Sequence, residues 1–190
     1  MNAPLDTTPP ADTATSRDRR VLLAAGAFAA AAGLGVAWWK SRPSEPVGAV
    51  AEPVPGFWAM QWETPQGGAI NLQSFRGRPL LINFWATWCP PCVEELPLID
   101  AFFEQNKSNG WQVIGLAVDK LSSVQAFLQK TPLHFPVGLA GLSGAELGRS
   151  LGNLTGGLPF SVALGANGAV IQRKMGRLSK EDLAMWAGLK

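Results

Sequence analysis

The chain has 190 residues, of which 47% are hydrophobic and 16% charged, and this length suits one ordinary domain with an appendage. A formal net charge of +2 provides no basic patch of the kind that holds nucleic acid, so nucleic acid is not an expected partner. Two cysteines and one histidine are too few for a four-ligand structural zinc site.

The N-terminal part carries signals for export or membrane attachment. Residues 1–20 are rich in Pro, Thr, Ala and Asp, which predicts a disordered tail. Residues 21–39 form an uncharged run of spanning length, preceded by arginines and ended by two tryptophans. These flanks favour a transmembrane signal anchor with the tail in the cytoplasm. Residues 40–55 contain four prolines and predict a linker to a folded domain over 56–190.

The alternative for the apolar run is a cleavable export signal. Ala49-Val50-Ala51 fits the small-residue pattern of a cleavage site, and the pair Arg19-Arg20 resembles a twin-arginine signal. We favour the anchor because the run reaches spanning length and Ala51 lies unusually far from it. Both interpretations put the domain outside the cytoplasm, where disulfides persist.

The folded part begins with a predicted hairpin. Residues 57–62 alternate partly and are expected to pair with 69–72 across the turn at 65–68. The run 80–85 is almost entirely apolar, as in a central strand buried on both faces. An apolar stripe over 91–106 then predicts a helix.

Strands and helices continue to alternate toward the C-terminus. Asn167-Gly168 is a strong hairpin signal, and Ser179 with Asp182 marks the start of a last helix. The expected elements are a strand over 111–118, a helix over 121–130, a short edge strand over 134–137, a helix over 144–151, and hairpin strands over 160–164 and 169–174. This order is typical of an α/β thioredoxin-like fold, a central mixed sheet flanked by helices, with an N-terminal hairpin and an inserted strand–helix unit.

The only two cysteines, Cys89 and Cys92, lie where the buried strand meets the following helix. A helix N-terminus stabilises a thiolate, which is the reactive form in thiol–disulfide exchange. Covalent haem attachment would need a histidine directly after the second cysteine, where Val93 stands. A structural disulfide over so short a loop would constrain the unfolded chain little. The pair therefore predicts redox chemistry.

The segment 83–97, NFWATWCPPCVEELP, resembles the TlpA/ResA branch of the thioredoxin superfamily, which is related to the redoxin and AhpC/TSA proteins. The resemblance continues through 113–119, 135–137 and 157–159 and covers roughly residues 57–187. It implies a membrane-anchored thiol–disulfide oxidoreductase whose only redox group is a cysteine disulfide, with no added cofactor or metal.

The resemblance also implies roles for the residues around the cysteines. Cys89 would be the exposed nucleophile, and Cys92 would resolve the mixed disulfide. Trp88 either shields the pair or packs in the core. Trp88, Pro90 and Pro91 would contact the substrate chain. The two prolines lack N–H groups, which weakens stabilisation of a thiolate and favours a reductant.

Two further features of the family map onto this chain. Pro159 matches a cis-proline that faces the dithiol, and Leu158 would pair with the substrate backbone. The aspartate of classical thioredoxins is replaced by Asn83, whereas ResA-like proteins carry a glutamate that corresponds to Glu95. A partly buried Glu95 with a raised pKa would take the proton of Cys92.

These observations predict an extracytoplasmic protein disulfide reductase, with cytochrome c maturation as one possible pathway. The resemblance places the domain in the periplasm, held by a single inner-membrane span or released by cleavage near Ala51. Disulfide-containing proteins would be its clients, and a membrane thiol carrier of the DsbD or CcdA kind would reduce it. The alternative function is metal handling, with the dithiol as copper ligands and His134 as the candidate third ligand.

Overall fold

The computed structural model describes residues 52–189. The predicted tail over 1–20, the apolar run over 21–39 and most of the linker over 40–55 lie outside these residues and stay predictions. Within 52–189, no helix combines the length and the apolar character that a membrane crossing requires.

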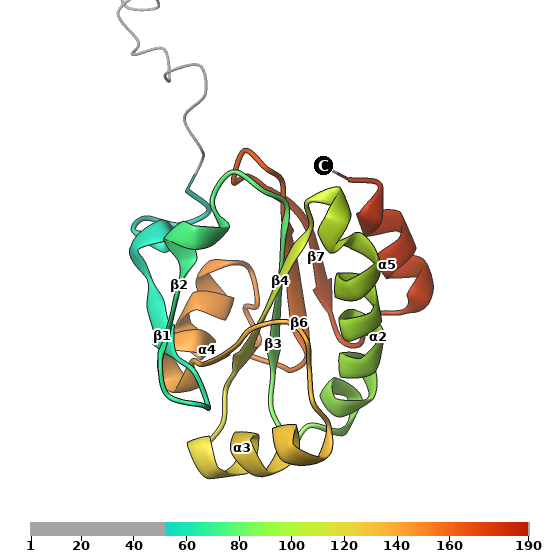
Figure 1. The fold of residues 1–190 in the computed structure, drawn as a ribbon. Coiled ribbons are helices and arrows are strands. Elements are labelled where there is room, and N and C mark those ends of the chain that lie inside the picture. The colour runs from blue at the N-terminus through green and yellow to red at the C-terminus, as the bar shows by residue number, and fades with distance from the viewer. Residues whose placement is uncertain (1–51, 190) are drawn as a thin grey trace, which may run out of the picture. The chain divides into compact units, whose positions relative to one another are not determined.

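Seven strands within the described residues form one mixed sheet in the order β2-β1-β5-β4-β3-β6-β7 (Figure 1). Parallel pairs join β3 to β4 and β4 to β5, whereas β3 to β6 and β6 to β7 are antiparallel. The α/β thioredoxin-like prediction is confirmed, including the N-terminal hairpin of β1 and β2. The strands are β1 (Gln61–Glu63), β2 (Ala69–Asn71), β3 (Leu80–Trp85), β4 (Gln112–Ala117), β5 (Val137–Leu139), β6 (Phe160–Leu164) and β7 (Val170–Met175).

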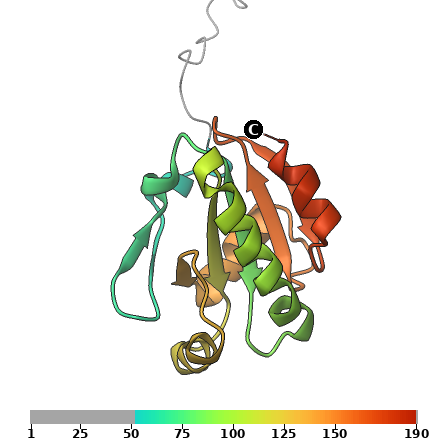
Figure 2. The ribbon, with the colours of Figure 1, turned by 45° about the vertical axis from the view of Figure 1, so that its right-hand side comes forward.

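Helices cover both faces of the sheet. The helices α2 (Pro90–Asn106) and α5 (Lys180–Ala187) lie side by side on one face, as Figures 1 and 2 show. The helix α3 (Leu121–Lys130) contributes Val124 to the same apolar cluster. The helix α4 (Gly141–Ser150) packs on the opposite face of the sheet, in one apolar cluster with residues from 57–75. Every residue of β3 is buried because both faces are covered.

Three predicted elements differ from the structure. Phe57–Ala59 forms a 3₁₀ turn rather than the start of a strand. The short strand predicted over 134–137 is Val137–Leu139, and it is internal because β1 pairs with it through Glu63 and Leu139. Helix α4 begins at Gly141, three residues before the predicted start. The edge position predicted for this strand was wrong because it depends on pairing between distant segments, which a local sequence pattern does not indicate.

Local signals near the C-terminus are confirmed. The Ser179 hydroxyl accepts a hydrogen bond from the Asp182 N–H at 3.1 Å, and the Asp182 carboxylate accepts one from the Ser179 N–H at 2.9 Å. These reciprocal bonds satisfy two of the unpaired donors at the start of α5. The hairpin between β6 and β7 turns at Gly168, whose φ of +79° suits glycine.

The core is tightly packed around Gly115 in β4. A Cβ there would lie 2.9 Å from Phe135 Cε2 and 3.1 Å from Trp85 Nε1. We expect Gly115→Ala to lower the free energy of unfolding by about 1–3 kcal/mol, since buried rings must shift. Urea denaturation measures this, with Gly188→Ala as the control because its nearest contact is an ordinary 3.5 Å. Equal losses in both variants would contradict the packing argument.

Candidate active site

Cys89 and Cys92 form a disulfide at the N-terminus of α2. The sulfur–sulfur distance is 2.03 Å and the Cα atoms are 5.3 Å apart. Cys89 is the N-cap residue and keeps 4% of its surface exposed, whereas Cys92 is completely buried. Cys89 is therefore more exposed than Cys92, as predicted, but both are buried in the disulfide form. In the disulfide form both residues belong to the apolar cluster beneath α2.

Two prolines shape the first turn of this helix. Pro90 and Pro91 are exposed and occupy the positions directly after the N-cap. The first available amides, those of Cys92 and Val93, donate to the carbonyl oxygen of Cys89 at 3.0 and 3.2 Å. In the disulfide form these donors are thus engaged by the backbone rather than by sulfur.

The peptide bond between Leu158 and Pro159 is cis, as the resemblance implies. Pro159 is buried directly before β6, and its carbonyl oxygen accepts a hydrogen bond from the Gly176 N–H at 2.9 Å. The preceding loop is fixed by Asn153, whose side-chain amide donates to the Gly157 carbonyl oxygen at 2.8 Å. The loop that carries the cis-proline is therefore held at both ends.

Trp88 is 65% exposed, so the alternative of core packing is wrong for this residue. Its side chain and Leu158 line one hollow of about 180 Å³, together with Phe84 and Val118. The glycines Gly144 and Gly148 of α4, with Ala145, form the other wall. Two of the predicted substrate contacts therefore lie at a single apolar hollow.

Glu95 is fully buried one helical turn after Cys92. Its Oε2 atom accepts a hydrogen bond from the Leu178 N–H at 2.6 Å, and its Oε1 atom accepts one from Asn83 Nδ2 at 2.7 Å. Burial raises its pKa from 4.5 to about 7, against the lowering effect of both hydrogen bonds and of the Arg177 charge. A carboxyl group with this pKa exchanges protons near neutral pH. The neighbouring Glu94 is exposed and forms an ion pair with Arg177 at 2.6 Å.

The contacts of Asn83 were not predicted from the sequence, in which this residue is only a departure from the thioredoxin pattern. Asn83 is a fully buried polar residue in the otherwise apolar strand β3. Its Nδ2 atom donates to Glu95 and also to Ser161 Oγ at 2.9 Å. A polar side chain within an apolar run was the available signal, because a buried amide needs hydrogen-bond partners.

A second missed contact holds the loop before the cysteines. Asp119 follows β4, and its Oδ2 atom accepts hydrogen bonds from the Thr87 N–H at 2.8 Å and the Thr87 hydroxyl at 2.6 Å. Burial opposes ionisation of Asp119, but the hydrogen bonds from Thr87 and Lys120 outweigh it and hold its pKa below the ordinary value. The carboxylate therefore fixes the chain two residues before Cys89.

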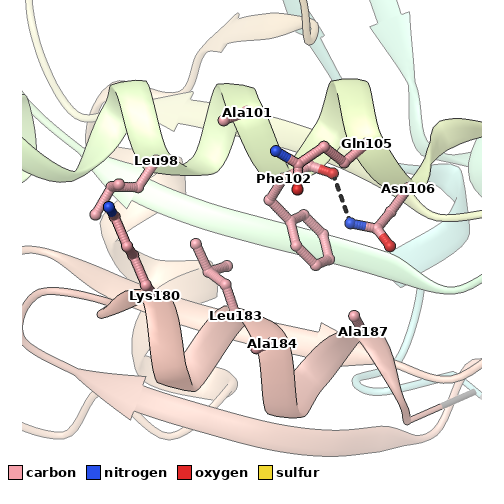
Figure 3. Close-up of a pocket in the computed structure, with 9 residues that line it drawn as sticks. All are labelled: Leu98, Ala101, Phe102, Gln105, Asn106, Lys180, Leu183, Ala184 and Ala187. Carbon is pink, nitrogen blue, oxygen red and sulfur yellow. Dashed lines mark hydrogen bonds between the residues drawn. The ribbon is translucent and has the colours of Figure 1, made fainter.

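The part of the chain that the structure describes has no group of three or more His, Cys, Asp or Glu side chains arranged to hold a metal ion. His134 is exposed, and its Nδ1–H donates a hydrogen bond to the Asp100 carboxylate at 2.8 Å. A separate groove of about 790 Å³ runs between α2 and α5, with Phe102 and Leu183 on facing helices (Figure 3). None of the predicted site residues lines this groove, so it is distinct from the disulfide site.

A model of the Redoxin family matches residues 50–185. The chain belongs to the redoxin family. Among its relatives, the thiol-disulfide oxidoreductase ResA of Bacillus thuringiensis subsp. konkukian is 34% identical over 119 residues, which is 62% of this chain and 66% of that relative. This redoxin chain therefore spans slightly less than two thirds of that ResA protein. The sporulation thiol-disulfide oxidoreductase A of Bacillus subtilis is 29% identical over 70% of this chain and 79% of its own.

Solved structures agree with this family. A thiol:disulfide interchange protein of the thioredoxin family from Chlorobium tepidum TLS has 30% sequence identity and a TM-score of 0.59. The alignment covers 68% of this redoxin chain and 93% of the solved one. The resemblance to the ResA branch that the motifs predicted is thereby confirmed.

Proposed function

We propose that this redoxin is a thiol–disulfide oxidoreductase that works as a protein disulfide reductase. The observation that carries the proposal is the Cys89–Cys92 disulfide at a helix N-terminus, with the buried Glu95, whose pKa is raised to about 7, one turn away. Names of the relatives support the general activity, since both ResA and the sporulation protein are called thiol-disulfide oxidoreductases.

The reaction begins with the reduced dithiol. The Cys89 thiolate attacks one sulfur of a client disulfide, forms a mixed disulfide and displaces the other client sulfur as a thiolate. Glu95 then takes the proton of the Cys92 thiol, and the Cys92 thiolate attacks Cys89 Sγ. This step releases the second client thiolate and closes the Cys89–Cys92 disulfide. The client gains two electrons, and the protein loses two.

Client proteins would dock at the hollow lined by Leu158 and by Trp88, the residue directly before Cys89. The exposed ring of Trp88 and the apolar wall at Leu158 suit an apolar side chain near the client's cysteine. The backbone before the cis-proline offers an edge for an extended client segment. Apocytochrome c is one candidate client, from the ResA resemblance.

The direction of electron flow follows from the first turn of α2. Pro90 and Pro91 provide no N–H groups, and the next two amides bond to the Cys89 carbonyl oxygen. A weakly stabilised thiolate leaves the disulfide favoured, which is the property of a reductant.

We therefore expect a reduction potential near that of thioredoxin, about −270 mV, rather than near that of DsbA, about −120 mV. Equilibration of the chain with dithiothreitol or glutathione buffers, followed by thiol trapping, measures it. A value above about −180 mV would overturn the reductase assignment and indicate disulfide formation or isomerisation.

The proposal includes a location outside the cytoplasm. The arginines before the apolar run 21–39 and the proline-rich segment 40–55 support a single inner-membrane anchor with the domain in the periplasm. A membrane thiol carrier of the DsbD or CcdA kind would then restore the dithiol. Labelling of reduced Cys89 by a membrane-impermeant maleimide in intact spheroplasts tests this, and protection of the cysteine until lysis would contradict it.

A further inference from the structure

Three glycines line the hollow that Trp88 borders. Gly144 and Gly148 belong to helix α4, and Gly156 lies in the loop that follows this helix. A helix interior favours alanine over glycine, so a glycine at such a position calls for a packing or functional reason. The reason can be sought by asking what a Cβ atom would meet at each of the three positions.

Packing and backbone conformation explain two of these glycines. A Cβ at Gly144 would clash with Ala140 Cβ, so no larger residue fits there. Gly156 has a φ of +68°, in the left-handed region that favours glycine. The fold therefore requires glycine at both positions, whatever the hollow does.

Gly148 has no such explanation. A Cβ there would lie 3.8 Å from the nearest atoms of Phe84 and 3.9 Å from Asn153 Cβ, which are ordinary contacts. Alanine would therefore fit at this position, and it would favour the helix. Because Phe84 and Asn153 both line the hollow, a side chain at 148 would occupy part of it. Glycine at this position thus keeps open a space that the fold does not need.

The open space is apolar. Its walls include Phe84, Trp88, Val118 and Leu158. Among the described residues that line it, none is charged and Asn153 alone has an amide side chain. This amide donates to the Gly157 carbonyl oxygen at 2.8 Å and accepts from the Thr155 hydroxyl at 3.5 Å. The lining therefore suits an apolar occupant rather than a charged one.

The size of the hollow points to an aromatic ring. An apolar cavity of about 150 Å³ is large enough to bind benzene. The hollow measures about 180 Å³, and it presents the rings of Phe84 and Trp88 on its walls. Aromatic rings pack favourably against one another, edge to face or offset. An added ring would also cover part of the Trp88 side chain, which is 65% exposed.

We propose that the hollow receives a phenylalanine side chain that neighbours the reactive cysteine of the client, and that Gly148 sets the size of the side chain accepted. Trp88 directly precedes Cys89, and Leu158 directly precedes the cis-proline. A client whose disulfide is attacked by Cys89 therefore places the residues next to its own cysteine close to the hollow. The inference rests on the proposed function and adds to it a preference among clients.

The test measures the first step of the reaction with model peptides. Each short peptide has one cysteine in a disulfide with thionitrobenzoate, and phenylalanine or alanine directly before or after that cysteine. In the full chain with Cys92→Ser, the reduced Cys89 thiolate attacks the peptide sulfur. A disulfide between Cys89 and the peptide forms, and thionitrobenzoate leaves as a coloured thiolate. Glutathione in place of the protein gives the intrinsic reactivity of each peptide.

The preference is the rate ratio of the phenylalanine to the alanine peptide, divided by the same ratio for glutathione. Because the ratio is taken within one variant, a change in the reactivity of Cys89 cancels. We expect a preference of about tenfold with phenylalanine on one side of the cysteine, as burial of a phenyl group supplies. Adding Gly148→Ala should reduce it to about threefold, and adding Gly148→Leu should abolish it.

Ser150→Ala is the matched control. Ser150 lies on α4 outside the hollow, so this variant should keep the full preference. Urea denaturation provides the second control. Gly148→Ala should unfold at the same or a higher urea concentration than the chain with glycine, because alanine favours the helix. A weaker fold then does not account for a lost preference, and the alanine variant decides the test even if Gly148→Leu fails to fold.

The outcomes separate this inference from the proposed function. Equal rates for the phenylalanine and alanine peptides would refute the inference and leave the oxidoreductase proposal in place. A tenfold preference that persists in Gly148→Ala and Gly148→Leu would place the ring elsewhere and refute it too. If no peptide released thionitrobenzoate, the proposed function would fail, and this inference with it.

Discussion

Replacing Cys92 by serine is expected to convert this redoxin into a covalent trap for its clients. Cys89 would still attack a client disulfide, but no thiolate would remain to release the mixed disulfide. Reduction of insulin should therefore fall to the uncatalysed rate, while a disulfide-linked adduct accumulates. Non-reducing gel electrophoresis followed by mass spectrometry detects the adduct and identifies the cysteine that carries it.

The matched control for this experiment is Cys89→Ser. Cys92 is fully buried under the first turn of α2, so on its own it should not reach a client disulfide. We expect neither turnover nor adduct from Cys89→Ser. Adducts of similar yield from both variants would contradict the assigned order of attack, and stable copper binding by the unsubstituted dithiol without turnover would favour the metal-handling alternative.

Replacing Glu95 by glutamine is expected to remove a pH dependence of stability. The folded protein raises the pKa of Glu95 from 4.5 to about 7, so it binds this proton more tightly than the unfolded chain does. The resulting stabilisation is complete below pH 4.5 and is lost as the pH rises toward and through 7. The full effect is about 3 kcal/mol for a buried carboxyl group with this shift.

Urea unfolding of the oxidised protein between about pH 5 and pH 8 measures this effect. The unsubstituted protein should lose stability over this range relative to Glu95→Gln, which carries no titrating proton. Glu94→Gln is the control, because Glu94 is exposed and its variant should keep the pH dependence. Parallel stability curves for the unsubstituted protein and Glu95→Gln would refute the raised pKa.

The Glu95→Gln variant also tests whether Glu95 accepts the proton of Cys92 during the reaction. If Glu95 takes the proton of Cys92, the variant should slow the release of mixed disulfides and lose the inflection near pH 7 in its rate profile. Formation of the mixed disulfide by Cys89 should be unaffected. Stopped-flow measurements of the two steps distinguish a proton acceptor from a residue needed only for folding, since a folding defect would affect both steps.

Much of the fold could be predicted because its signals are local. The all-apolar run Leu80–Trp85 indicated a buried central strand, and Asn167-Gly168 indicated the hairpin between β6 and β7. The position of Val137–Leu139 inside the sheet was not predictable in this way. It depends on a pairing with β1, which lies more than seventy residues earlier in the chain.

In the candidate site, too, local features could be predicted and features that depend on distant segments could not. The two cysteines at a helix start could be predicted from neighbouring residues, and the cis bond before Pro159 from the family resemblance. The resemblance implied a partly buried Glu95, but its complete burial and its hydrogen bonds depend on tertiary packing, since its partners Leu178 and Asn83 are 83 and 12 positions away. A pKa depends on the solvent and donors that surround a group in space, and these are set by packing between segments rather than by sequence spacing.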